Sequence, residues 1–285
     1  MNQNENEVPK VRGVGEGEKI APVTRVTKST REIRDDVLVV EEPLEIRVVF
    51  GSKEKRKSKS LSITMRTPGS DFELAAGFLL SENIVGHPSD IQSFEHVGPA
   101  EAGKDHGNTL MVELGFDVPL EIEKLQRHFY TTSSCGICGK ASLDAVRAQG
   151  LEPFQSKLKV DEQVVFTLPD GLRKHQGIFE RTGGIHAAGL ADVNGNFVAI
   201  REDVGRHNAV DKLIGSQMLE GKFPISDSVL VVSGRASFEL VQKALMAKIR
   251  MMVAVGAPSS LAVELAREFN MALIGFASSE RFNVY

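Results

Sequence analysis

Two cysteines that stand close together are the residues of this sequence best suited to chemistry. Cys135 and Cys138 are the only cysteines among 285 residues, and each is followed by a glycine in the polar run Thr131 to Lys140. Serine, threonine and glycine neighbours keep thiols accessible, whereas cysteines with a packing role stand among apolar residues. The pair therefore predicts sulfur or metal chemistry.

Three kinds of chemistry use this spacing, and the spacing alone does not choose among them. A structural zinc site needs four ligands, so histidines would have to join, and His186 and His207 lie far downstream. A redox dithiol is expected at a helix N-terminus, and residues 140–146 could form that helix. In a sulfur carrier a thiolate accepts sulfur as a persulfide, and Lys140 and the helix N-terminus would stabilise the thiolate.

Composition excludes several classes of protein. A net charge of -4 and a pI near 6.0 argue against nucleic-acid binding, since no broad cationic surface is available. No apolar stretch approaches the roughly 20 residues that span a bilayer, and the N-terminus lacks the apolar core of a signal peptide. Two thiols without a disulfide framework fit a reducing cytoplasm.

The first half of the chain predicts an α+β region. Residues 1–34 are polar and aperiodic, so we expect a disordered tail. Residues 35–160, which include the cysteine loop, then predict a mostly antiparallel sheet and one buried helix capped by Ser70 or Asp71. The expected strands are 36–40, 44–50, 61–66 and two weaker ones within 91–122, and the helix is 72–80.

The second half, residues 161–285, alternates strands and helices. A helix is expected from Leu168 to Gln176, and Asn194-Gly195 between two apolar runs indicates a hairpin. The units that follow predict a three-layer αβα domain, whose ligands bind at the carboxyl ends of the strands. They are helices 205–219, 237–248 and 259–269, and strands 228–233, 251–255 and 271–276.

Three strand-to-helix turns fall at that edge of the sheet, at 202–208, 233–237 and 256–260. Helix N-termini bind phosphates readily, although glycine and serine there also serve as ordinary caps. Arg206 and Arg235 favour an anion, because a cap needs no guanidinium. Neither a Walker loop nor a dinucleotide-binding glycine fingerprint is present.

Two other residues receive structural interpretations. His186 stands among alanine and glycine in an expected strand, which favours a satisfied buried histidine over a metal ligand. Lys243 is expected on a solvated helix face.

Five motifs in order resemble one known family. They are Thr67 to Phe78, Cys135 to Gly139, Asp203 to Lys212, Ser233 to Glu239 and Gly275 to Tyr285. Together they look like the formate dehydrogenase accessory sulfurtransferase family, FdhD, from about residue 35 to the end of the chain.

The resemblance implies a sulfurtransferase required for formate dehydrogenase activity. Such a protein takes sulfur from a cysteine desulfurase as a cysteine persulfide and passes it to molybdenum bound by two molybdopterin guanine dinucleotides. Because each dinucleotide contains a guanine nucleotide, GDP is a surrogate ligand for this cofactor. Cys135 matches the sulfur-carrying cysteine of the family, and Cys138 matches a second cysteine. The stretch that matches the cofactor-binding motif is Phe276, Ala277, Ser278, Ser279, Glu280 and Arg281, with Ser279-Glu280 where the family often has glycine or proline.

The second domain of that family is similar to the cytidine deaminase fold. Deaminases hold zinc with H-x-E and P-C-x-x-C, where this chain has His207-Asn208-Ala209 and Gly234 to Ser237. We therefore expect no metal, and phosphates held near Arg206, His207, Arg235 and Ser259. A homodimer would offer two clefts to the two nucleotide arms. The alternative is a zinc-stabilised binding protein without catalysis, with both cysteines and two histidines as ligands.

Overall fold

The structure is a computed structural model. It describes residues 12–15, 17–99, 107–116, 118, 146–147 and 149–285, so Cys135 and Cys138 lie outside the described residues. Within the described ranges no helix is both long and apolar enough to cross a membrane.

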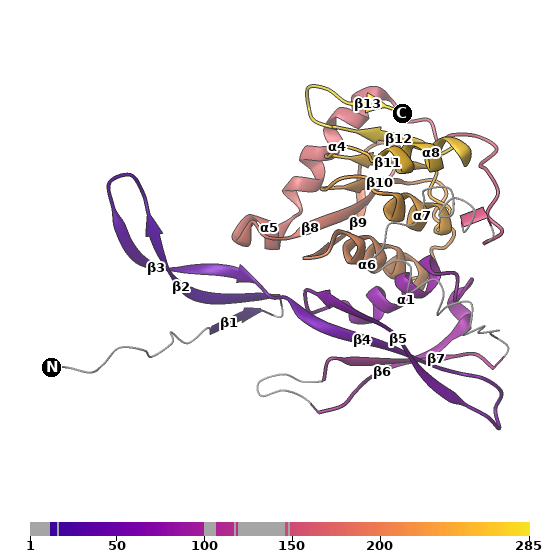
Figure 1. Cartoon of the computed structure of the whole chain (residues 1–285). Helices are drawn as coiled ribbons and strands as arrows, with labels where there is room; N and C mark the ends of the chain where they lie inside the picture. Colours follow the sequence, from indigo (N-terminus) through magenta and orange to yellow (C-terminus); the bar gives the residue numbers. More distant parts are fainter. Residues whose placement is uncertain (1–11, 16, 100–106, 117, 119–145, 148) are drawn as a thin grey trace.

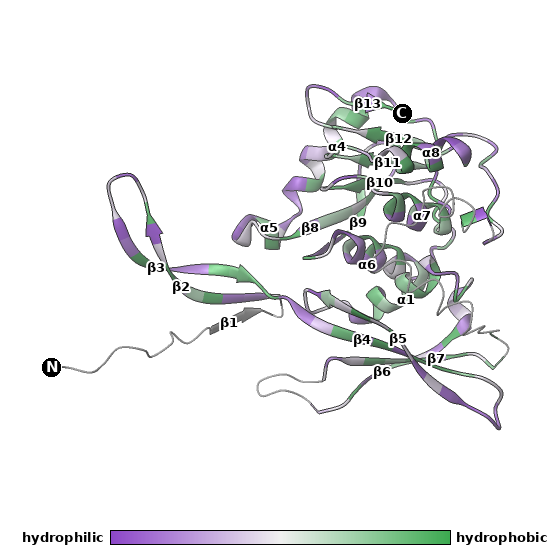
Figure 2. Cartoon of the chain, in the orientation of Figure 1, coloured by the Kyte–Doolittle hydropathy of each residue, from purple (hydrophilic) through white to green (hydrophobic). Residues whose placement is uncertain are grey.

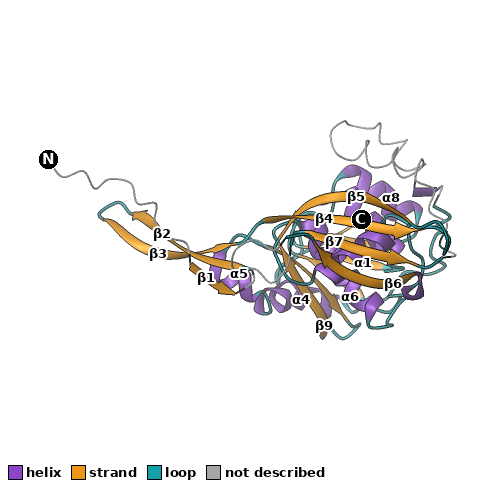
Figure 3. Ribbon diagram, turned by 90° about the horizontal axis from the view of Figure 1, so that it is seen from below, coloured by secondary structure: helices purple, strands orange, loops and turns teal. Residues whose placement is uncertain are grey.

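An N-terminal arm projects from the rest of the described chain (Figures 1 and 3). Its sheet has the order β1-β2-β3, formed by β1 (Arg12–Gly15), β2 (Glu18–Val26) and β3 (Arg31–Val39). The expectation of disorder up to residue 34 is therefore wrong for residues 18–34. Many of these residues are β-branched, which favours strands, and the buried Glu18 carboxylate accepts a 2.7 Å hydrogen bond from Arg181, a residue distant in sequence.

The next region is the expected mostly antiparallel sheet with one helix. Strand order is β5-β4-β7-β6, and only β4 and β7 run parallel. Helix α1 (Asp71–Ser81) begins after Ser70, is largely hydrophobic (Figure 2) and shares a core with alternate residues of β4, such as Leu44 and Ile46. The remaining bounds are β4 (Glu42–Phe50), β5 (Lys57–Arg66), the short 3-10 helix η1 (Pro88–Asp90), β6 (Ile91–Val97) and β7 (Thr109–Leu114).

The C-terminal region contains a six-stranded mixed sheet of order β13-β12-β11-β10-β8-β9. The three strands β10, β11 and β12 are parallel, and β8 and β9 form the predicted hairpin. Strand β13 was not expected. The bounds are β8 (His186–Ala191), β9 (Phe197–Asp203), β10 (Val229–Val232), β11 (Met251–Ala254), β12 (Ala272–Gly275) and β13 (Asn283–Val284).

Helices cover both faces of this sheet, which confirms the mixed α/β architecture. Alternate strand residues divide between two hydrophobic clusters, one shared with α6 (Arg206–Leu219), α7 (Phe238–Met246) and α8 (Ser260–Glu268) and the other with α4 (Glu162–Lys174). Helix α4 begins earlier than expected, after its N-cap Asp161, and contains Pro169 in its interior. The short α5 (Gly177–Thr182) follows.

Helices α1 and α6 join the two regions. A Cβ built on Gly77 would lie 1.9 Å from the carbonyl oxygen of Asp211, and one on Gly215 would lie 1.9 Å from that of Glu73. The two glycines therefore let the helix backbones touch. One hydrophobic cluster consequently runs across the boundary predicted at residue 160; the division into two domains and the likeness to cytidine deaminases stay predictions.

Candidate functional site

The turns that follow β10 and β11, two of the three predicted ones, lie together with the turn after β12 at the carboxyl edge of the sheet. Backbone bonds link them in series: Gly256 N donates to Gly234 O at 3.0 Å, and Phe276 N donates to Gly256 O at 3.1 Å. The turn after β9, where α6 begins, lies at the same edge because His186 at the start of β8 pairs with Asp203 at the end of β9. The topology therefore gathers residues from four separate segments.

Arg206, His186 and His207 converge at this edge. A Cβ built on Gly234 would lie 3.5 Å from the His186 ring and 3.9 Å from Arg206 Cδ. Burial and then the charge of Arg206 lower the pKa of His186, and the same two causes lower the pKa of His207 to about 4. Both imidazoles are thus neutral at pH 7, and Arg206 carries the positive charge of this group.

Three arginines have side chains without partners among the described residues. Arg206 Nε is buried and has no hydrogen-bond partner there. Arg235, on the turn before α7, and Arg281, near the C-terminus, are exposed. Such guanidinium groups are available to an anionic ligand, for which arginine is well suited.

The helix N-termini at this edge differ from one another. Gly205 precedes α6 without a side-chain capping bond. Ser237 makes no such bond before α7 either, but the carboxylate of Glu239 accepts a hydrogen bond from its own backbone N–H in the first turn of that helix. Ser259, by contrast, accepts a 3.2 Å hydrogen bond from Ala262 N and caps its own helix α8. Ser259 therefore caps its own helix, whereas the N-cap residues of α6 and α7 do not.

The predicted cofactor-binding stretch forms a tight turn. Ser278 N donates to Arg281 O at 2.9 Å, and Ser278 Oγ accepts a bond from Arg281 N at 3.1 Å. Phe276, Ser279 and Glu280 are exposed beside it. The carboxylate of Glu280 adds a negative charge at the rim of the site.

A cavity of about 550 Å³ lies between this turn and helices α4 and α5. Of the predicted residues only Ala277, Ser278 and Ser279 line it, whereas Arg206, Arg235 and Ser259 do not. Sequence reasoning missed the opposite wall, which contains Arg173, Gln176 and Phe179 of the α4–α5 segment, because their spacing indicates only a helix.

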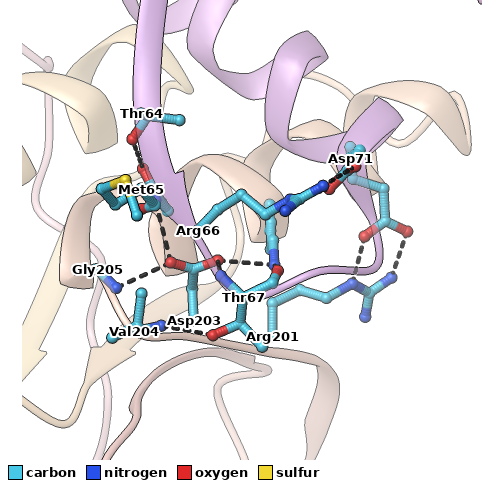
Figure 4. A network of polar contacts seen from close by, with 12 residues as sticks. Thr64, Met65, Arg66, Thr67, Asp71, Arg201, Asp203, Val204 and Gly205 are labelled. Atoms are coloured by element: carbon cyan, nitrogen blue, oxygen red, sulfur yellow. Dashed lines mark hydrogen bonds and ion pairs between the residues drawn. The ribbon is translucent and has the colours of Figure 1, made fainter. Parts of the chain in front are cut away.

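A buried polar network fixes the start of α6 (Figure 4). The Asp203 carboxylate is fully buried and accepts hydrogen bonds from Thr67 N at 3.1 Å and Gly205 N at 2.8 Å. Lys212 Nζ lies 2.7 Å from Asp203 and donates to Thr67 O at 2.7 Å. Two further ion pairs, Arg66 with Asp71 and Arg201 with Glu73, flank it. The network thus ties the turn that carries Arg206 to the loop before α1.

No group of three or more histidine, cysteine or acidic side chains that could hold a metal occurs among the residues with described positions. The nearest polar partners of His207 are Ser237 Oγ at 3.4 Å and Glu239 Oε2 at 3.9 Å. Because both cysteines lie outside the described ranges, these contacts do not test the zinc alternative.

Comparison with known proteins gives consistent results. The sequence model of the FdhD/NarQ family matches residues 39–285. Two proteins named sulfur carrier protein FdhD, from Streptomyces avermitilis and Nocardia farcinica, are 48% and 49% identical to this chain; each alignment covers 92% of the chain, and 92% and 91% of the relatives. A third protein of that name, from Picrophilus torridus, is 41% identical over 90% of the chain and 92% of its own length.

A solved structure has a similar fold. It is a protein from Desulfotalea psychrophila described as a formate dehydrogenase accessory protein, with a TM-score of 0.69, 22% identity and coverage of 94% of this chain and 96% of its own. At that identity the likeness shows the shared fold. The motif order, the family match over most of the chain and the relatives at nearly half identity lead to one conclusion: the chain belongs to the FdhD/NarQ family.

Proposed function

We propose that this protein is a sulfur carrier that serves formate dehydrogenase. It accepts sulfur from a cysteine desulfurase as a persulfide on Cys135 and transfers it to molybdenum bound by two molybdopterin guanine dinucleotides. The observation that carries the proposal is the Cys135-x-x-Cys138 pair in a chain that is 48% and 49% identical to two proteins named sulfur carrier protein FdhD. The desulfurase, the formate dehydrogenase and a homodimer are the proposed partners, in the reducing cytoplasm.

The first step is a thiol–persulfide exchange. The Cys135 thiolate attacks the outer sulfur of the desulfurase persulfide, the S–S bond of the desulfurase breaks, and a new S–S bond forms on Cys135 while the desulfurase thiolate leaves. No net oxidation occurs, so the step needs no further reactant. Mass spectrometry after incubation with a desulfurase and cysteine tests it through the gain of one sulfur atom on Cys135.

The carboxyl edge of the six-stranded sheet is the proposed site for the nucleotide phosphates of the cofactor. The free guanidinium groups of Arg206 and Arg235 support this, together with the N-terminus of α6, where Gly205 makes no side-chain capping bond. Arg281 closes the site, and His207 is a neutral neighbour that can share a hydrogen bond. The cofactor is the substrate here, and GDP represents one of its arms.

Removing either Arg206 or Arg235 should weaken GDP binding by about tenfold or more, because each charge-assisted hydrogen bond contributes about 1.5–3 kcal/mol. Calorimetry with GDP measures this. The matched control is Arg267→Ala, which removes an exposed arginine in the last turn of α8. If Arg206→Ala, Arg235→Ala protein binds GDP as tightly as the parent, the phosphates do not bind at this edge.

The zinc-stabilised binding protein is tested by elemental analysis of protein purified without added zinc. We expect no stoichiometric zinc, because Asn208, Ala209, Arg235 and Ala236 occupy the positions that matched the deaminase ligands. One tightly held zinc per chain, lost on replacing either cysteine, would favour the alternative over sulfur transfer.

A further inference from the structure

The cavity between helices α4 and α5 and the carboxyl edge has the size of a small-molecule site. Its volume of about 550 Å³ lies within the range typical of ligand pockets. One wall comes from the α4–α5 segment, and the other comes from the ends of β8, β10 and β12 and the turns beside them. No residue of the α4–α5 wall belongs to the motifs that carry the family resemblance.

Gln176 is the unusual member of that wall. Its side chain is 95% buried, at 5% exposure, yet its amide nitrogen has no hydrogen-bond partner among the described residues. It precedes α5 but makes no capping bond there. A buried donor without a partner destabilises the folded protein, so this amide does not contribute to the stability of the fold.

Arg173 and Phe179 form a flat stacked pair in the same wall. The guanidinium carbon of Arg173 lies 3.8 Å from the centre of the Phe179 ring, and both residues line the cavity. Planar side chains of this kind pack well against a planar heteroaromatic ring. This wall therefore suits a base better than a sugar or a phosphate.

The charges around the cavity also favour a base over a phosphate as its occupant. Leu172 and Ile185 are apolar, His186 is neutral because burial lowers its pKa, and the charged side chains that line the cavity, Asp170 and Arg173, offset one another. Arg206 and Arg235, proposed above for the phosphates, are outside the lining. A nucleotide would place its base in the cavity and its phosphates at the rim.

We propose that this cavity binds the base of the nucleotide and that Gln176 is a specificity-determining residue, whose amide donates a hydrogen bond to the 6-carbonyl oxygen of guanine. This rests on the proposed function, in which a guanine nucleotide is the ligand. Adenine carries an amino group, a donor, at the same ring position. Because the amide nitrogen of Gln176, and not its amide oxygen, is the buried atom without a partner among the described residues, this side chain favours a 6-oxopurine.

Calorimetry with GDP, IDP and ADP on the full chain tests the proposal, since IDP keeps the 6-carbonyl and lacks only the 2-amino group. Gln176→Leu should weaken GDP and IDP binding alike by about tenfold, equivalent to about 1.4 kcal/mol, and should change ADP binding less than about twofold. Because leucine removes an unpaired buried donor, the ligand-free variant should unfold at the same temperature as the parent or higher. Gln163→Leu, at an exposed position of α4, is the matched control and should leave all three affinities unchanged.

Unchanged GDP binding by Gln176→Leu, or an equal loss for ADP, would overturn the role of Gln176 and leave the sulfur carrier intact. A parent protein that binds none of the three nucleotides would instead remove the nucleotide site itself. Sulfur transfer to Cys135 is measured without nucleotide, so its failure is a separate result that bears on the proposed function alone.

Discussion

Cys135→Ala protein, incubated with a cysteine desulfurase and cysteine, should gain no sulfur, and formate dehydrogenase matured with it should be inactive. The thiolate is the nucleophile in persulfide exchange, and alanine offers no atom that can hold the sulfur. The loss should be complete. Mass spectrometry of the modified peptide and formate oxidation by the matured enzyme are the two measurements.

Cys138→Ala is the matched control, because it removes the other thiol of the same Cys-x-x-Cys pair. It should keep the sulfur on Cys135 and reduce enzyme maturation less than Cys135→Ala does. Full formate dehydrogenase activity with Cys135→Ala, together with sulfur still carried by the protein, would mean that another group is the acceptor.

The sequence predicts those parts of the fold that depend on local patterns. Asn194-Gly195 identifies the β8–β9 hairpin, and the alternation of strands and helices after residue 205 identifies the mixed sheet and its edge. The carboxyl edge gathers the turns that carry Arg206 and Arg235 because topology alone decides which strand ends lie together.

Contacts between residues far apart in the chain were not predictable in this way. Lys243 was expected on a solvated face, but it is buried and lies 2.8 Å from Asp211, a residue of α6. Burial raises the pKa of Asp211, and the charge of Lys243 opposes that shift. The N-terminal arm was missed for the same reason, since its Glu18 anchor meets Arg181 only in the folded chain.

The unpaired amide nitrogen of Gln176 was also not predictable from the sequence, because it too depends on contacts made in the folded chain. Its neighbours in sequence give a helix end, and the burial of its side chain and its unpaired amide nitrogen arise only in the folded chain. A sequence pattern reports which face of a helix is apolar, and it does not report which polar groups find partners in the folded chain.

Asp203→Ala should lower the free energy of unfolding by about 3–5 kcal/mol, because it leaves the ammonium group of Lys212 buried without a counter-charge. Lys212 is 2% exposed, and its other described contact is the carbonyl oxygen of Thr67. Thr67 N loses its acceptor as well. Urea unfolding followed by circular dichroism measures the change.

The control is Glu220→Ala, which breaks the exposed pair of Glu220 with Lys222 on the same part of the chain and should change stability little.

The double variant Asp203→Ala, Lys212→Met separates two causes of the loss, the unpaired charge of Lys212 and the N–H groups left without an acceptor. If the unpaired charge dominates, methionine restores much of the lost stability, since a buried pair replaced by apolar groups is often neutral. If the double variant is as unstable as Asp203→Ala, the loss comes from the N–H groups of Thr67, Gly205 and the Asn208 side chain that no longer have the carboxylate as acceptor. Parent-like stability of Asp203→Ala would show that neither matters. The turn carrying Arg206 would then be held by the packing of α1 against α6 and by the bonds from Val204 N to Thr67 Oγ1 and from Asn208 Nδ2 to Met65 O.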